Sequence, residues 1–331
     1  MSCDLRQVTW QSSDADKRAV MALHGFVVPE VLPQGAAAPQ LSDYQWATQS
    51  RLTAPWGDEI YGLVGAFEES QCLGTAAYTV SARGQGILAQ VLTDPERRGQ
   101  GIGTATLNRA VAAFREHGAR AVYLAAWEEW KRALYQRIGF RFSGAMGERH
   151  AYKLTLGPAG EDEALFAPGQ QTRIRPLGPG DQADVSALFN AEHPCVVKHY
   201  EMGCFLGSHF EGEFYALQRD RRPGVRALVL DGEETAMGFG TVIPSKRRHE
   251  GHRGTVDMLV HPHYRDRAGE LLAALEADAS TETLVVYVSD SEMTRREVLE
   301  AAGYRAAGRL GDGLRISGAA YDLTMLEKHL S

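Results

Sequence analysis

The first half of the chain shows two hydrophobic patterns that follow one another in a regular order. Apolar residues three and four apart on polar segments predict amphipathic helices, and short apolar runs predict strands. The expected helices cover 14–25, ended by Gly25, then 41–52, a segment that begins at Thr104, and 130–139. The expected strands cover 4–10, 60–67, 73–80, 87–93, 121–127 and 148–156. This order favours helices packed on a largely antiparallel sheet.

The second half of the chain repeats this order of elements. A strand leads into a helix over 172–190, and two strands meet at an Asp-Gly turn within 225–244. Such a repeated order indicates an internal duplication. Aligned by hand, 91–103 corresponds to 258–270, and 134–140 corresponds to 298–304.

The length of 331 residues suits two domains of ordinary size. Glycine, proline and acidic residues without periodicity predict a linker over 158–171. We therefore expect an α/β (α+β) fold with two tandem domains, 1–157 and 172–331. Each should be a mostly antiparallel mixed sheet flanked by helices.

Composition limits the functions that such a fold can have. The net charge of -7 argues against a nucleic-acid role, because phosphate backbones are bound by basic surfaces. The four cysteines lack a disulfide or metal-ligand spacing, which is typical of a reducing compartment. No apolar run reaches the roughly 20 residues of a membrane span, and the N-terminal residues lack a signal-peptide core. We therefore expect a soluble cytoplasmic protein that binds neither nucleic acid nor membranes.

The segment 95–111 has glycine at 99, 101 and 103 directly before a helical pattern. Glycine lets the backbone come close to an anion, and a helix start adds unpaired N–H groups and a positive dipole end. The loop therefore predicts a phosphate or pyrophosphate ligand. It is neither a P-loop nor a dinucleotide-binding loop, because the lysine of the first and the glycine spacing of the second are missing. A flexible glycine loop with solvated arginines is the alternative.

This loop resembles the acyl-CoA-binding signature of the GNAT N-acetyltransferases. The resemblance rests on Arg98-x-x-Gly101-x-Gly103, with AQVLTDP before it and ALYQRIGF after it, and it covers most of residues 1–157. It implies two tandem GNAT-like domains, acetyl-CoA as cosubstrate and no metal. It also implies that the strand before the loop splays from its neighbour. By this resemblance, pantetheine binds the backbone of Val91, Leu92 and Thr93, and the phosphates lie among Arg98, Gly99, Gln100, Gly101, Ile102, Gly103 and Thr104.

The same resemblance makes Tyr135 the general acid. Transfer of an acyl group from a thioester expels a thiolate, which a phenol with an ordinary pKa of about 10 can protonate. Periodicity alone favours an ordinary tyrosine on the apolar side of a helix, whereas the motif context favours the acid. Many members carry a carboxylate on the strand before the loop, but Ala89 and Gln90 stand there, so the base is unassigned. Glu128 is a candidate for substrate recognition or proton relay, with a solvated turn as the alternative.

The second half lacks the residues that carry this resemblance. Asp266, Ala268 and Glu270 align with the three glycines, and Leu299 aligns with Tyr135. Carboxylates in a phosphate cradle weaken anion binding, and loss of the phenol removes the proton donor. We expect a degenerate, non-catalytic domain that either completes the substrate pocket or buries an apolar face otherwise buried by dimerisation.

The sequence thus predicts an acetyl-CoA-dependent N-acetyltransferase that acylates a primary amine of a small molecule by direct attack in a ternary complex. Two alternatives stay open: a non-catalytic acyl-CoA-binding sensor, and a CoA-dependent decarboxylase or hydrolase on the same scaffold. The protein is expected to be a monomer or a homodimer. Candidate amine-site residues are Tyr44, Trp46, Trp56, Asp58 and Glu59, with an ordinary surface segment as the alternative.

Overall fold

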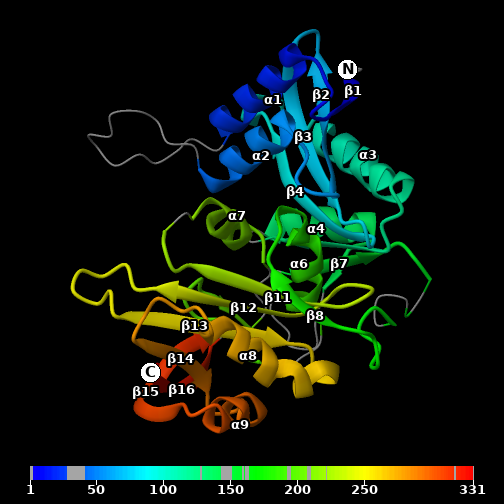
Figure 1. The fold of residues 1–331 in the computed structure, drawn as a ribbon. Helices are drawn as coiled ribbons and strands as arrows, with labels where there is room; N and C mark the ends of the chain where they lie inside the picture. Colours follow the sequence, from blue (N-terminus) through cyan, green and yellow to red (C-terminus); the bar gives the residue numbers. More distant parts are fainter. Residues whose placement is uncertain are drawn as a thin grey trace.

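The computed structural model contains two seven-stranded mixed sheets in tandem (Figure 1). The strands of the first sheet lie within 4–155 and those of the second within 173–329, so the predicted fold class is confirmed. Among the described residues, no helix combines the length and apolar character needed to cross a membrane. The structure describes residues 3–27, 42–126, 129–142, 151–158, 160, 164–191, 195–206, 210–220, 222–316 and 318–330.

The first domain follows the predicted order, with a short additional strand, β6, before its last strand. The strands lie side by side in the order β1-β2-β3-β4-β5-β7-β6. Among the described strands of this sheet, β4 and β5 pair in parallel and the other neighbours pair antiparallel. In chain order the elements are β1 (Asp4–Val8), α1 (Asp14–Val27), α2 (Asp43–Thr53), β2 (Ile60–Glu68), β3 (Gln71–Val80), β4 (Gln85–Thr93), the 3-10 turn η1 (Pro95–Arg97), α3 (Ile102–Glu116), β5 (Ala121–Ala125), α4 (Glu129–Ile138), β6 (Arg141–Phe142) and β7 (Ala151–Thr155).

Alternate side chains of the first sheet enter two separate cores. Tyr78 and Leu88 pack with Leu107 beneath α3. Ala77 and Ile87, each one residue away, enter the core beneath α1 and α2. Successive side chains of a strand point to opposite faces, so both faces of the sheet need an apolar cover. This explains why its strands read as apolar runs and not as alternating patterns.

Two helix ends differ from the sequence expectation. Helix α1 continues past Gly25 to Val27, and α3 begins at Ile102, two residues before Thr104. The φ of Gly25 is not positive, so it does not adopt the left-handed conformation that ends many helices. A glycine inside a helix costs only about 1 kcal/mol, which the packing of α1 on the sheet can offset.

The second domain has the same strand order as the first. Its sheet runs β8-β11-β12-β13-β14-β16-β15, again with one parallel pair, β13 and β14. The elements are β8 (Arg173–Pro176), η2 (Pro179–Asp181), α6 (Gln182–Asn190), β9 (Val197–His199), β10 (Cys204–Phe205), α7 (Gly212–Arg219), β11 (Arg226–Asp231), β12 (Ala236–Pro244), β13 (Arg253–Val260), η3 (Pro262–Arg267), α8 (Ala268–Glu276), β14 (Thr283–Ser289), α9 (Met293–Ala301), β15 (Arg305–Ile316) and β16 (Ala319–His329).

Hydrogen bonds at aligned positions agree with the internal duplication. After α4, the N–H of Phe140 donates to the carbonyl of Tyr135 at 3.1 Å. After α9, the N–H of Tyr304 donates to the carbonyl of Leu299 at 3.0 Å. These pairs are the ones that the sequence alignment matches, so the two halves share local geometry as well as element order.

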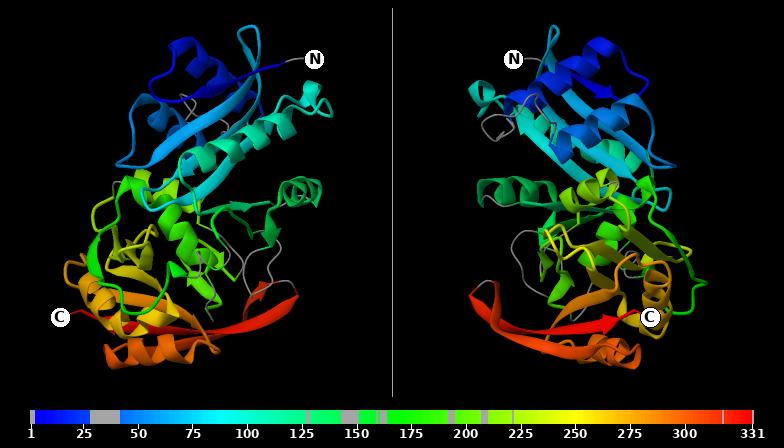
Figure 2. Two further views of the ribbon diagram at one scale, coloured as in Figure 1. Left: turned by 90° about the vertical axis from the view of Figure 1, so that its right-hand side faces the viewer. Right: turned by 60° about the vertical axis from the view of Figure 1, so that its left-hand side comes forward.

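Helix α6 of the second domain lies between the two sheets (Figure 1). Its residues Val185 and Leu188 share one apolar cluster with Ala121 and Tyr123 of β5 in the first sheet. The views in Figure 2 show the two halves of the chain stacked, with the termini at opposite ends. The domains therefore share a buried core, in agreement with the expectation that the second domain covers an apolar face of the first.

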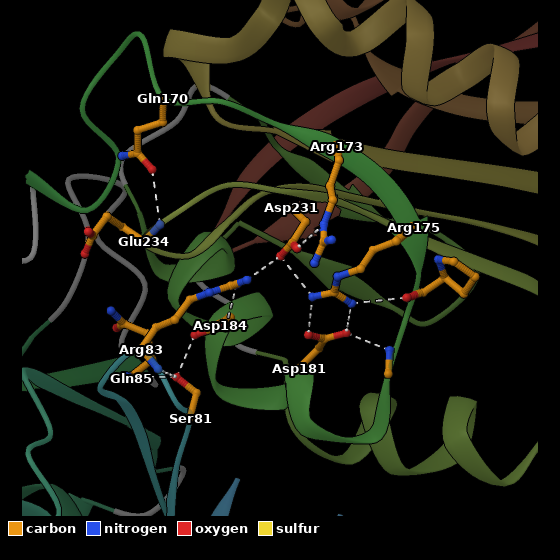
Figure 3. A network of polar contacts seen from close by, with 12 residues as sticks. Ser81, Arg83, Gln85, Gln170, Arg173, Arg175, Asp181, Asp184, Asp231 and Glu234 are labelled. Atoms are coloured by element: carbon orange, nitrogen blue, oxygen red, sulfur yellow. Dashed lines mark hydrogen bonds and ion pairs between the residues drawn. The ribbon is translucent and has the colours of Figure 1, made fainter. Parts of the chain in front are cut away.

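Arg83, in the turn between β3 and β4, carries a polar network across this interface (Figure 3). Its Nη1 donates to Asp184 Oδ2 at 3.0 Å, and its Nη2 donates to Asp231 Oδ1 at 2.7 Å. Ser81 Oγ donates to Asp184, and Arg175 donates to Asp231. Burial raises the pKa of Asp184 to about 6. Burial also opposes ionisation of Asp231, but hydrogen bonds from Arg175 and Arg83 outweigh it and lower the pKa of Asp231 to about 2.

A fully buried ion pair of the first domain, Arg51 with Glu59, also contacts the second domain. Arg51 Nε donates to Glu59 Oε1 at 2.6 Å, and Arg51 Nη2 donates to Gln182 Oε1 of α6 at 2.8 Å. The guanidinium carbon of Arg51 lies 4.2 Å from the ring centroid of Trp56 and 5.2 Å from that of Tyr215. A buried guanidinium needs such partners, and the contacts with Gln182 and Tyr215 tie Arg51 to the second domain, although its Nη1 has no hydrogen-bond partner among the described residues.

Candidate cofactor cleft

Strands β4 and β5 separate where the sequence predicts the cofactor. Residues 85–87 of β4 pair with 121–123 of β5, and beyond them β4 pairs only with β3. Val91, Leu92 and Thr93 lie on this separated part. Backbone groups on the open side of a strand need partners, which an extended ligand can supply. The predicted splay of the strand is therefore confirmed.

A bulge at Gln90 shapes the separated part of β4. Gln90 and Val91 both lie opposite the single residue Ala76 of β3. Gln90 has a φ of 50°, in the left-handed region that non-glycine residues rarely adopt. The extra residue reverses the alternation of side chains, so Ala89 packs beneath α1 and α2 while Val91 packs beneath α3.

The glycine loop after β4 presents unpaired backbone N–H groups. Gly99 and Gly101 have φ values of 77° and 80°, and Gly101 is the N-cap of α3 without a side-chain cap. Among the described residues, no N–H from Gly99 to Thr104 donates to another backbone group, and the first turn of α3 has no acidic residue. Such a loop before a helix N-terminus can hold an anion. It has the geometry that the sequence predicts for a phosphate cradle.

The two arginines before the loop differ in their surroundings. Arg97 forms an ion pair with Glu68 of β2, which holds its guanidinium against the sheet. Arg98 is exposed and has no ion pair with any residue that the structure describes. Of the two, Arg98 is therefore the side chain that is available to a phosphate.

Tyr135 lies on α4, on the same side of the sheet as the side chain of Val91. Its ring is 6% exposed and contacts Phe140 edge to face, with 6.0 Å between the ring centroids. Tyr135 and Val91 pack in the same apolar cluster beneath α3. The other candidate catalytic residue, Glu128, lies outside the described residues.

The family comparison matches the elements that build this cleft. Residues 31–140 match the family model described as the acetyltransferase (GNAT) family. The first domain therefore contains a segment that matches the GNAT acetyltransferases. The matched segment contains the separated β4 and β5, the bulge, the glycine loop and Tyr135, so the geometry and the family match concern the same residues.

Solved structures of GNAT acetyltransferases are similar to half of the chain. A GNAT-family acetyltransferase from Streptococcus pneumoniae is 16% identical over 49% of this chain and 100% of its own, with a TM-score of 0.40. A ribosomal-protein-alanine N-acetyltransferase from Brucella melitensis is 19% identical over 48% and 99%, with a TM-score of 0.39. A Salmonella typhimurium protein described as an acetyltransferase, solved with its cofactor acetyl-CoA, is 15% identical over 48% and 94%, with a TM-score of 0.39. A search of curated proteins finds none with significant sequence similarity.

In this GNAT domain a fixed amide occupies the position of the expected base. Gln90 Nε2 donates to Thr48 Oγ1 at 2.6 Å, and Tyr61 donates to Gln90 Oε1 at 3.3 Å. Thr75 Oγ1 donates to the Gln90 carbonyl at 3.0 Å and lies 3.4 Å from His24 Nε2. Burial lowers the pKa of His24 to about 4, so its imidazole is neutral at pH 7. Sequence reasoning missed His24, because nothing in its spacing on α1 connects it to β4.

The residues expected to line the amine site lie beside the second domain. Tyr44 packs against Tyr215 of α7, with 5.2 Å between ring centroids. Glu59 is buried in its ion pair with Arg51. Aromatic and acidic side chains can line a binding site or a domain interface equally well. The sequence does not show which, whereas the structure places α7 of the second domain against Tyr44. The other three candidates also lie next to residues of the second domain. Trp56 contacts Tyr215, Trp46 contacts Trp56 and Arg219, and the carboxylate of Asp58 is next to Gly180.

The second domain has a helical turn where the GNAT domain has the glycine loop. Its segment η3 runs directly into α8, and the N–H of Ala268 donates to the carbonyl of Arg265. Glu270 forms a two-pronged contact with Arg267, both distances being 2.8 Å. Leu299, at the position of the tyrosine, is buried in the core. Within its described residues the second domain therefore has neither the open N–H groups nor the phenol of the first.

Proposed function

We propose that the GNAT domain is an N-acetyltransferase that uses acetyl-CoA to acylate a primary amine of a small molecule. The proposal rests on one observation: the separated part of β4, with the gap beside it, leads directly into the glycine loop at the N-terminus of α3. The gap offers strand pairing to an amide-containing chain, and the cradle offers N–H groups and Arg98 to phosphates. Pantetheine and pyrophosphate are linked in this order in coenzyme A.

In the proposed reaction the amine nitrogen attacks the thioester carbonyl carbon directly. The new carbon–nitrogen bond forms as the carbon–sulfur bond breaks, and the departing sulfur takes the proton of the Tyr135 phenol. The nitrogen of the new amide gives up its extra proton to water, and solvent returns a proton to the phenolate. Tyr135 is suited to this role by its position on α4, on the Val91 side of the sheet.

The amine must lose a proton, and the first domain offers no carboxylate on β4 to take it. Gln90 cannot accept a proton at neutral pH, and its amide is already held by Thr48 and Tyr61. We therefore propose that the amine loses its proton to water. Turnover should then rise with pH until the amine of the substrate is itself deprotonated.

Titration of acetyl-CoA into the full chain tests the site. Gly103→Glu should abolish binding, since a Cβ at this position already lies 3.1 Å from Thr93 Oγ1 and the new carboxylate faces the cradle. Asn108→Glu adds the same charge further along α3, on an exposed position, and should bind like the unaltered chain. Equal binding by both variants would contradict the placement of the cofactor.

Release of thiol from acetyl-CoA with a panel of small primary amines tests the reaction. Amine-dependent release that Tyr135→Phe reduces supports the transferase. Binding of acetyl-CoA without release for any amine would favour the sensor, which the loss of the carboxylate at Gln90 makes the second candidate. Release without an amine would favour a hydrolase or decarboxylase.

A further inference from the structure

The second domain contains a cavity of about 260 Å³ between β13, α8 and α9. Its wall is mostly apolar. The apolar side chains include Met258 and Val260 of β13 and Met293 and Val298 of α9. Burying apolar groups of a ligand here is favourable in the same way as burying them in a core.

This cavity is the counterpart of the cofactor cleft in the first domain. Strands β13 and β14 pair in parallel at only three positions and then separate, as β4 and β5 do. The cavity lies on the separated part. Four residues of its wall align with residues predicted to bind the cofactor: Met258 with Val91, Val260 with Thr93, Arg265 with Arg98 and Ala268 with Gly101.

The cavity is not built for a pyrophosphate. The N–H groups of η3 are used inside the turn, as that of Tyr264 is by the carbonyl of His261 at 2.8 Å. Asp266 and Glu270 replace two glycines of the cradle, and Glu270 is held by Arg267. A doubly charged phosphate chain would meet repulsion there instead of N–H groups.

Arg265 and the start of helix α9 lie at the cavity and can bind a ligand with a single negative charge. Arg265 is exposed at the cavity and pairs with no carboxylate among the described residues. Helix α9 starts at the cavity wall, and its N-cap residue Glu292 makes no side-chain cap. Helix N-termini favour anions, and an arginine binds a carboxylate with charge-assisted hydrogen bonds.

The acidic groups near the cavity are held by other groups of the protein. Glu292 accepts the N–H of Val197 at 2.7 Å and lies 3.4 Å from Arg295 Nη1. Asp257 accepts two backbone N–H groups and lies 3.8 Å from Arg295 Nη2. Arg295 also lines the cavity and is 8% exposed, and in the described part of the chain it is the one cation beside these two carboxylates. Its Nε and Nη2 have no hydrogen-bond partner among the described residues, and Arg265 is the exposed cation at the same cavity.

We infer that this cavity binds a small monocarboxylate with an unbranched apolar body. The apolar part lies against Met258, Val260 and Val298, and the carboxylate lies between Arg265 and the start of α9. At roughly 30 Å³ for each water-sized group, the volume has room for a body of about nine such groups. The second domain is then a binding module for a ligand that differs from the cofactor of the first.

Titration of sodium octanoate into the full chain, with 1-octanol and octylamine as equal-length comparators, tests this inference. Octanoate should bind more tightly than octanol, and octylamine least. Arg265→Gln should weaken octanoate binding about threefold to tenfold, in keeping with one partly exposed charge-assisted contact. Arg98→Gln, the aligned change in the first domain, should leave octanoate binding unchanged and affect acetyl-CoA only.

Met293 gives an independent variant, because its side chain is 58% exposed and its replacement should not disturb the fold. Met293→Glu should weaken octanoate binding more than tenfold, whereas Met293→Gln should weaken it less. Equal binding of octanoate and octanol, or octanoate binding that Arg265→Gln does not change, would overturn the inference. Octanoate binding lost in Arg98→Gln would place the ligand in the first domain and overturn it as well.

Discussion

Replacing Arg83 with methionine should destabilise the chain through the domain interface. Arg83 is the cation that Asp184 and Asp231 share, at 3.0 Å and 2.7 Å. Asp231 keeps Arg175 at 2.9 Å and Arg173 at 3.2 Å after the change. Asp184 keeps only the hydroxyl of Ser81. The cost therefore falls mainly on Asp184, which is left buried without a cation.

The size of this cost follows from burial. Removing one partner of a buried ion pair costs about 3–5 kcal/mol, because the other charge is left uncompensated. Here Arg83 is itself 23% exposed, and Asp184 can escape the penalty by taking a proton. We therefore expect a loss of about 2–4 kcal/mol in the free energy of unfolding at pH 7.

Urea unfolding of Arg83→Met, Asp184→Asn and the double variant measures this coupling. The double variant should be more stable than the sum of the single losses predicts, because it leaves no unpaired charge. Arg120→Met is the matched control: Arg120 also crosses the interface, to Glu234 at 2.7 Å, but that pair is exposed and should contribute only about 0–1 kcal/mol. Equal losses for Arg83→Met and Arg120→Met, or additive effects in the double variant, would refute the reasoning.

Three further predictions concern activity, pH and the loop. Tyr135→Phe should lower kcat about 10²- to 10⁴-fold without changing the Kd of acetyl-CoA, since a general acid acts on the leaving group and not on binding; equal kcat would exclude it as the acid. Burial raises the pKa of Asp184 to about 6, above its ordinary value near 4, so the folded state binds the proton more tightly than the unfolded state. As the pH rises from 4 to 6, the free energy of unfolding should therefore fall by up to about 3 kcal/mol. Urea unfolding at each pH measures this fall, which should be absent in Asp184→Asn. Gly101→Ala should cost about 1–2 kcal/mol of stability because φ is 80°, whereas Gly269→Ala in α8, without a positive φ, should be neutral or stabilising in thermal melts.

Much of the cleft could be predicted because its features are local in sequence. The glycines at 99, 101 and 103 predict close approach of the backbone to an anion and a helix start within one short segment. Gly99 and Gly101 have positive φ values, and α3 begins at Ile102 in the same segment. The bulge at Gln90 could not be predicted, since its left-handed φ is imposed by the strand on one side and by Thr48 and Tyr61 from other elements. A non-glycine residue gives no signal in the sequence for such a conformation.

By itself the sequence determined the order of elements, the duplication and the loop, because hydrophobic periodicity and glycine chemistry act over a few residues. Only the tertiary structure decided that Tyr44 and Glu59 serve the domain interface, and that the second domain keeps a cavity where it has lost the cradle. A buried charge such as Glu59 is acceptable only beside its partner Arg51, and an empty volume exists only between packed elements. Both depend on the distances between segments that are far apart along the chain, which hydrophobic patterning leaves open.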